Sequence, residues 1–278
     1  ANVEESARAP ELTESVARGP AKYDPRFLSC DPFGGSPSFV NYGLSAELHY
    51  LAPGERYYTV GEYFAHGTRL PVDIFFSDVN VPTRPFSSGF PSQAGPSFTR
   101  PDGQVLVEFF ALRYRSKLQL GPNDLPGKYQ IALLSDDGSI LSADLDGDGS
   151  PSPFLNNDGD HPSKLACATR TVRFDNSTRL PIQLDYYQGP KFHIANIILW
   201  RHIPESQDEE ANPSILSDAQ CGNSGNALFF DSTQTPPTPQ TAWIDLLSRG
   251  WKVLERENYL LSEEHPQNPC CPGCDIGA

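Results

Sequence analysis

Apolar residues occur along most of this chain in short bursts whose length suits β-strands. From about residue 42 onward, clusters of Pro, Gly and Asn or Asp separate these bursts, as is typical of antiparallel sheet proteins. Alternation is clearest over residues 180–187, where every second residue is large and apolar and the others are mostly polar. The strands that we expect are residues 44–51, 56–64, 72–76, 104–115, 127–135, 139–144, 164–174, 179–188 and 192–202.

This pattern predicts an all-β fold, an antiparallel β-sandwich over residues 42–202. Residues 1–41 are expected to be an N-terminal extension, with a short helix near residues 11–18. Residues 203–278 change character and are expected to form a C-terminal appendage with a cysteine-rich end, in which residues 242–249 are the best helix candidate.

Residues 81–101 are rich in Pro, Ser, Gly and Phe and are too long and irregular for a hairpin turn. We expect this segment to run over the surface of the sandwich. Its three phenylalanines, Phe86, Phe90 and Phe98, could anchor the segment or form a platform for a ligand, and anchoring is the commoner use.

The charge balance narrows the possible partners. A net charge of -14 and a pI near 4.8 argue against nucleic acid, whose phosphates need clustered Lys and Arg. No apolar run approaches the roughly 20 residues that span a bilayer. Cations or neutral ligands suit this surface better.

The cysteines and the N-terminus indicate export. The six cysteines are an even set with wide spacing, which favours disulfides in an oxidising compartment, and their pairing is left open. They are Cys30, Cys167, Cys221, Cys270, Cys271 and Cys274. The chain begins at Ala1 and contains no Met, so we expect a protein whose signal peptide has been removed and which lies outside the cell or on its surface. We also expect a bacterial source.

The main chemical signal is an aspartate pair between two expected strands, in the sequence Ser135-Asp136-Asp137-Gly138-Ser139. Adjacent carboxylates repel each other unless a cation or several donors gather their oxygens. Calcium takes about six to eight oxygen ligands and suits such a site. Calcium is therefore the expected cofactor.

A second acidic motif follows, with Asp144, Asp146 and Asp148 at alternate positions before Gly149. This spacing resembles the first half of an EF-hand loop, but the twelfth position is Leu155 where Glu is expected. We therefore expect one composite site that recruits further oxygens from residues 156–160. The expected metal ligands are Asp136, Asp137, Asp144, Asp146, Asp148, Asn157 and Asp158. The alternative is a solvated acidic loop with Asx-turns.

Several segments together resemble the protective-antigen-type (PA-fourteen) domain of surface adhesins and lectins. They are the aspartate pair, residues 155–161 (LNNDGDH), residues 184–189 (LDYYQG) and residues 197–200 (IILW), in the family's order and spacing. The resemblance covers about residues 42–202. It implies a β-sandwich in which the paired aspartates, commonly joined by a cis peptide, hold a calcium ion that binds sugar hydroxyls directly.

The same resemblance implies where a ligand would bind. Flocculins of this family add an Asn from the loop between the last two strands, whereas residues 188–193 here contain none. Other residues of the neighbouring loops would take its place. The ligand-binding candidates are Asp136, Asp137, Asp160, His161, Gln188, Lys191 and Phe192, with a hydrogen-bonding or packing role expected for His161.

The resulting hypothesis is a calcium-dependent, cell-surface recognition or adhesion module that binds carbohydrate and catalyses no reaction. Common hydrolase and nucleotide-binding signatures are absent from the sequence. Two alternatives stay open, since a fold does not fix a function. One is a homotypic receptor of the myxobacterial kin-recognition type, whose partner is another copy of itself. The other is a structural docking domain in which calcium only orders the loops.

Overall fold

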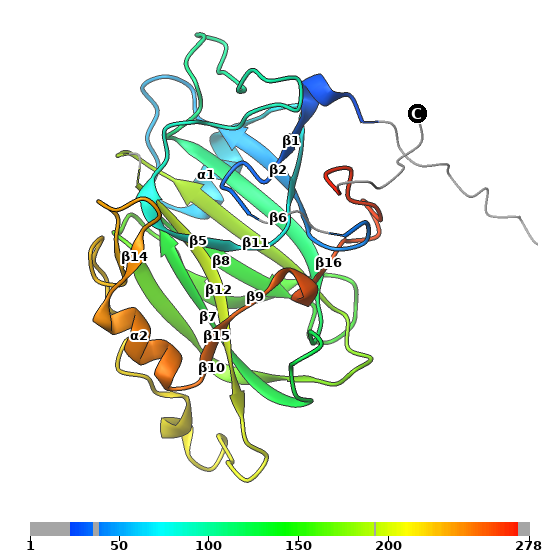
Figure 1. Ribbon diagram of the computed structural model, residues 1–278, viewed down its shortest axis with the longest axis vertical. Coiled ribbons are helices and arrows are strands. Elements are labelled where there is room, and N and C mark those ends of the chain that lie inside the picture. Colours follow the sequence, from blue (N-terminus) through cyan, green and yellow to red (C-terminus); the bar gives the residue numbers. More distant parts are fainter. Residues whose placement is uncertain (1–22, 36–38, 192, 272–278) are drawn as a thin grey trace, which may run out of the picture.

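The computed structural model describes residues 23–35, 39–191 and 193–271, which fold into two β-sheets packed face to face (Figure 1). The strands of the larger sheet are β1 (Leu28–Cys30), β2 (Leu44–Tyr50), β3 (Thr68–Arg69), β4 (Asp73–Phe76), β6 (Phe110–Leu118), β8 (Ser139–Ala143), β9 (Ser152–Asn157), β11 (Leu180–Gln188) and β16 (Tyr259–Leu260). Those of the smaller sheet are β5 (Asn80–Pro85), β7 (Gly127–Asp136), β10 (Lys164–Phe174), β12 (His193–Ile203) and β15 (Trp251–Val253).

The remaining elements are short. They are the pair β13 (Phe230–Asp231) and β14 (Thr238–Pro239), the helices α1 (Val60–His66) and α2 (Thr241–Ser248), and the 3-10 turns Pro25–Phe27, Pro213–Leu216 and Arg256–Asn258. The larger sheet has the order β1-β4-β2-β6-β11-β8-β9, with β3 beside β2 and β16 beside β6. The smaller sheet has the order β10-β7-β12-β15, with β5 beside β12. The predicted antiparallel β-sandwich is confirmed, with one parallel pair, β1 and β4.

The main core lies between the sheets. Strand β11 alternates as its sequence predicts, with Leu180, Ile182 and Leu184 buried and the residues between them half-buried. Strand β7 differs because it is buried on both faces. Its Ile131 and Leu133 face the main core, while Ala132 and Leu134 join a second cluster beneath α2. A central strand with both faces covered becomes continuously apolar.

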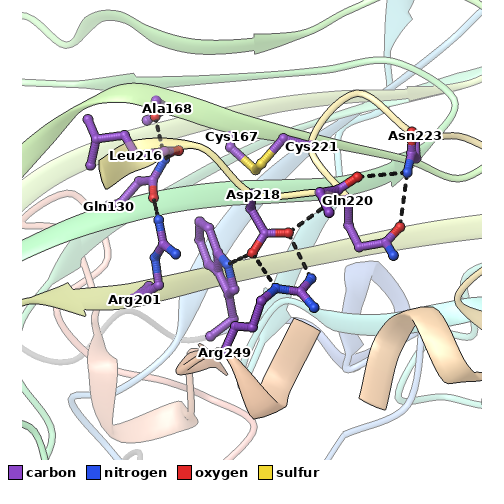
Figure 2. Close-up of a disulfide and its surroundings, with 12 residues drawn as sticks. Gln130, Cys167, Ala168, Arg201, Leu216, Asp218, Gln220, Cys221, Asn223 and Arg249 are labelled. Carbon is purple, nitrogen blue, oxygen red and sulfur yellow. Dashed lines mark hydrogen bonds and ion pairs between the residues drawn. A yellow bond between two sulfur atoms is a disulfide. The ribbon is translucent and has the colours of Figure 1, made fainter. Parts of the chain in front are cut away.

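The C-terminal segment forms that second layer and is fixed to the small sheet. The Cys167–Cys221 disulfide ties it to β10, and the buried Asp218 carboxylate accepts hydrogen bonds from Arg249 and from Trp251 Nε1 (Figure 2). Strand β15 then pairs with β12 and β16 pairs with β6. The expected boundary at residue 202 is therefore wrong, because residues beyond it complete both sheets.

The N-terminal boundary also moves. Strand β1 lies within the expected extension but pairs with β4, and a disulfide joins Cys30 to Cys270 across 240 residues. Cys271 is disulfide-bonded as well. The expectation of disulfides is thus confirmed for these five cysteines, whereas Cys274 and the helix expected near residues 11–18 lie outside the described residues.

Residues 56–64 were expected to be a strand, and this prediction is wrong. Helix α1 begins there instead, because the side chain of Thr59 caps it by accepting from the Glu62 backbone N–H. Glu62 returns the interaction by accepting from the Thr59 hydroxyl and from the Tyr58 backbone N–H. This local capping outweighs the β-propensity of the aromatic residues.

Four other expectations are confirmed or change in detail. The segment 81–101 begins with strand β5, and its Phe86 and Phe90 are fully buried, so the anchoring role is confirmed. Strand β6 begins at Phe110 and not at 104, and β9 forms inside what was expected to be one acidic loop. The helix expected at 242–249 is confirmed as α2. No helix in the described part of the chain is long and apolar enough to cross a membrane.

Candidate functional site

The aspartate pair sits at the turn between β7 and β8, at one end of the sandwich. Asp136 ends β7, and Ser139 begins β8 two residues after Asp137. Both aspartates are buried, with exposed fractions of 6% and 7%, and the peptide bond that joins them is cis. Two adjacent carboxylates therefore lie largely out of contact with water.

Backbone groups from two other segments orient this pair. The Asp137 carboxylate accepts hydrogen bonds from the backbone N–H of Gly189, at 2.8 Å, and of His161, at 3.2 Å. The Tyr186 hydroxyl donates to the backbone carbonyl of Asp136 at 2.6 Å. The end of β11 and the loop between β9 and β10 thus converge on the turn.

Two of the buried oxygens near this turn, Asp136 Oδ2 and Asn157 Oδ1, have no hydrogen-bond donor among the described residues. The Asn157 amide nitrogen is fully engaged, since it donates to Ser135 Oγ and to the Lys164 carbonyl, both at 2.9 Å. This fixes the amide so that its oxygen points away from those partners. A buried acceptor without a donor is costly unless something else binds it.

Burial, together with the neighbouring Asp137 charge, raises the pKa of Asp136 to about 8, although hydrogen bonds from Ser163 act in the opposite direction. Burial likewise raises the pKa of Asp137 to about 6, where the Gly189 N–H lowers it and the Asp160 charge raises it. Without a counter-ion, the protein thus disfavours two negative charges here. A bound cation would reverse this balance by attracting both carboxylates.

Two more carboxylates border the pair. Asp160 accepts from the Tyr187 hydroxyl at 2.7 Å and forms an ion pair with Arg56 at 2.8 Å. Asp158 accepts from the backbone N–H of Val60, the first residue of α1, at 2.9 Å. Helix α1 and the loop before it therefore close one side of the site, and no sequence signal placed them there.

Glycines allow these segments to approach so closely. A Cβ at Gly138 would lie 2.5 Å from the Tyr187 ring and 2.7 Å from Asp158 Oδ1. A Cβ at Gly189 would lie 3.0 Å from Asp137 Oδ2 and 3.6 Å from Asp160 Oδ1. The contacts of Gly189 show that Asp137 and Asp160 share one small region.

In the loop after β11, the structure contradicts the predicted role of one residue. Gln188 is fully buried, and its side chain accepts from the Tyr186 hydroxyl and donates to the Lys191 carbonyl. The prediction that Gln188 contacts a ligand is therefore wrong, because its amide holds the loop in place. Lys191 is exposed and stays a prediction as a ligand contact. Phe192 lies outside the described residues.

His161 has the structural role that was expected. Its ring nitrogens lie 2.9 Å from the Asn157 carbonyl and 3.1 Å from the Pro162 carbonyl, while its backbone N–H serves Asp137. These contacts close the turn after β9. They leave ligand binding by the ring as an untested prediction.

The prediction of a single composite metal site is wrong, because the predicted ligands lie in two separate groups. Asp144, Asp146 and Asp148 follow β8, whereas Asp136 and Asp137 precede it, so the whole strand lies between the two groups. Seven extended residues span about 20 Å. The acidic motifs lie at opposite ends of β8, while Asn157 and Asp158 remain with the aspartate pair because β9 runs back antiparallel to β8.

Solved structures with a related fold were found by comparison of the coordinates. A PA14 sugar-binding domain from an RTX adhesin aligns with 58% of this chain and 90% of its own, at 14% identity and a TM-score of 0.40. The PA14 domain of the antifreeze protein MpAFP aligns with 63% of this chain and 89% of its own, at 11% identity and a TM-score of 0.44. This chain resembles PA14 domains.

A further similar structure is the A domain of epithelial adhesin 6 from Candida glabrata, in complex with Galβ1-3GlcNAc. It aligns with 77% of this chain and 96% of its own length, at 14% identity and a TM-score of 0.38. Searches against protein-family models and curated proteins gave no match. The site must therefore be judged on its own residues.

Proposed function

We propose that this domain is an extracellular recognition module that binds carbohydrate through a calcium ion held by Asp136 and Asp137. The observation that carries the proposal is the unpartnered, buried Asp136 Oδ2 beside a second buried carboxylate. Asn157 Oδ1 offers a further oxygen without a donor. Carboxylate and amide oxygens are the donor set that calcium prefers, so these residues fit the ion. Bound there, calcium would supply positive charge for polar groups of a ligand.

The rim of the site supports a carbohydrate partner. Tyr58 has an exposed fraction of 54%, and the guanidinium of Arg56 lies 5.0 Å from its ring centroid. The Tyr58 carbonyl accepts from Tyr187, whose hydroxyl also reaches Asp160, so this ring borders the acidic cluster. An exposed aromatic face beside polar groups suits a sugar, which has both apolar C–H surfaces and hydroxyls. The similarity of the motifs to lectin-active PA14 domains points the same way.

A glycan array in calcium and in chelator tests this proposal directly. Wild type is expected to bind a subset of glycans in calcium only, and Asp137→Asn is expected to lose that signal at least 100-fold while remaining folded. The matched control is Glu210→Gln, which removes an exposed charge beyond the other end of β7. Glycan binding that persists in chelator, or in Asp137→Asn, would remove the assigned role of the aspartates.

Analytical ultracentrifugation tests the alternative in which the partner is a second copy of this chain. Over a range of concentrations in calcium, we expect wild type to sediment as one species. Calcium-dependent self-association without any glycan signal would replace carbohydrate by a second copy of this chain as the partner.

A further inference from the structure

The acidic loop between β8 and β9 lies apart from the aspartate pair and brings three carboxylates together. Ligand oxygens of Asp144, Asp146 and Asp148 all lie within 4.8 Å of one another. Negative charges at such distances repel each other. None of the ion pairs in the described residues includes these aspartates, so no Lys or Arg side chain offsets the repulsion.

The decisive member of this cluster is Asp144, because it is not a surface residue. Its exposed fraction is 7%, and its buried Oδ1 has no hydrogen-bond partner among the residues that the structure describes. Its Oδ2 accepts from the Gly149 backbone N–H at 3.0 Å, which curls the loop around the carboxylate. A buried carboxylate oxygen without a donor that belongs to a cluster of acidic groups marks a place for a cation.

The other two aspartates are exposed, and their contacts are local. Asp148 Oδ1 accepts from the Ser150 backbone N–H at 2.7 Å, which is the Asx-turn that the sequence allowed as an alternative. An Asx-turn accounts for this one oxygen. It leaves the Asp144 Oδ1 atom and the proximity of the three side chains unexplained.

We infer that Asp144, Asp146 and Asp148 form a second divalent-cation site, distinct from the aspartate pair, that takes calcium and fixes the turn of the β8–β9 hairpin. Three carboxylates with room for backbone carbonyls and water suit the six to eight oxygens and flexible geometry of calcium better than the strict octahedron of magnesium. The site lacks a twelfth-position Glu. We therefore expect a dissociation constant of roughly 0.1–1 mM, as in extracellular calcium modules.

The position of this loop explains what the ion would do. Strand β9 is the last strand of the larger sheet and pairs only with β8 in that sheet. The pair of strands ends where Ala143 of β8 lies opposite Ser152 of β9. Residues 144–151 are the connection between the two strands. A cation bound by three of these residues would hold the turn that joins the two strands of this edge hairpin.

Isothermal titration calorimetry of the intact chain with 0–10 mM calcium counts the ions that bind. The test variant is Asp146→Asn with Asp148→Asn, which leaves the buried Asp144 in place and so preserves the fold. Its matched control is Glu210→Gln with Glu264→Gln, which removes two exposed charges elsewhere. Wild type and control are expected to bind two ions, and the test variant one.

The outcomes separate this site from the proposed function. Loss of one ion in the Asp146/Asp148 double variant, with the other lost in Asp137→Asn, supports both sites. A single ion that is lost only in Asp137→Asn overturns the second site and leaves the proposed function standing. A single ion that is lost only in the double variant supports the second site and overturns the calcium role of the aspartate pair. Absence of any calcium binding overturns both.

Hydrogen exchange gives a local readout that does not depend on counting ions. Calcium at 5 mM is expected to slow exchange in a peptide that covers residues 144–151 at least fivefold in wild type and in Asp137→Asn. The Asp146/Asp148 double variant is expected to show no such slowing. Equal slowing of this peptide in the double variant would overturn the assignment of the ion to these side chains.

Discussion

The two ends of strand β8 carry the same chemistry in different settings. Before β8, Asp136 and Asp137 are both buried and receive contacts from β11 and from the β9–β10 loop. After β8, Asp144 is buried, whereas Asp146 and Asp148 are exposed, and every hydrogen bond to their side chains comes from the same loop. The first cluster is assembled by the fold, and the second is assembled by consecutive residues. Their sensitivity to metal, pH and mutation should therefore differ.

The largest difference should appear in calcium-induced stabilisation. A ligand present at about 100 times its dissociation constant stabilises a protein by roughly 2.7 kcal/mol, and each kcal/mol raises the melting temperature of a domain of this size by about 2–4 °C. At 5 mM calcium, we expect Asp137→Asn to lose about 5–10 °C of the stabilisation seen in wild type. The Asp146/Asp148 double variant should lose about half as much or less. Differential scanning fluorimetry in calcium and in chelator measures both.

The comparison fails if the two variants lose equal stabilisation, because the buried pair would then gain no more from an ion than the exposed loop does. Glu210→Gln serves as the control here too. It should retain the full calcium response.

The next effect is on the pH dependence of stability in chelator. The folded pKa values of Asp136, about 8, and of Asp137, about 6, lie above the usual value of an aspartate, so the folded state binds more protons than the unfolded state between about pH 4 and 8. Stability from this pair is therefore present at low pH and is lost as the pH rises. Each pKa unit corresponds to about 1.4 kcal/mol.

We accordingly expect wild type in chelator to melt several degrees higher at pH 5.5 than at pH 8. Asp136→Asn should lose most of that difference and should be more stable than wild type at pH 8 without calcium, because it removes the costlier buried charge. The same variant should gain less from calcium. A pH profile of Asp136→Asn that parallels wild type would show that this carboxyl does not control the effect.

These expectations depend on contacts that the sequence only partly predicts. The acidic motifs were visible because their residues are adjacent or alternate, and the strand-length bursts of apolar residues located β7, β8 and β11 around them. Local sequence thus identifies Asp136, Asp137 and the Asp144–Asp148 loop as candidate cation ligands. The expectation of one joint site was wrong although the expected strand 139–144 already separated the two motifs. No signal in the sequence indicated β9, whose Pro and Asn residues are typical of a loop.

The residues that complete the first cluster could not be predicted in this way. Arg56 reaches Asp160 across 104 positions, and the Val60 N–H reaches Asp158 across 98. No local pattern encodes such pairs, and the aromatic residues of 56–64 favoured a strand. Only the sandwich topology places α1 beside the end of β11. The fold class was therefore predictable from the sequence, whereas the side of the site that α1 and the preceding loop form was not.

A smaller effect is expected for a substitution on the side of the site that α1 forms. Asp158→Ala removes the acceptor for the Val60 N–H at the start of α1, so we expect a loss of about 1 kcal/mol of stability, as for a lost helix cap. Asp158→Asn is the matched control, because its amide oxygen can still accept and its stability should be near wild type. Chemical denaturation in chelator measures both. If Asp158→Asn is as destabilised as Asp158→Ala, the charge of Asp158 matters more than the hydrogen bond that it accepts.

The smallest expected effect completes the comparison. Asp146→Asn with Asp148→Asn changes a loop at the opposite end of β8 from the aspartate pair, so calcium-dependent glycan binding should change less than twofold. Surface substitutions away from a packed or bonded feature usually alter stability by less than about 0.5 kcal/mol, and nothing in the described residues links this loop to Tyr58 or Lys191 at the other end. Titration of the strongest array glycan against wild type and the double variant at saturating calcium measures the ratio. A tenfold loss would mean that the two ends of β8 are energetically coupled, and the ion in the loop would then have to be counted as part of recognition.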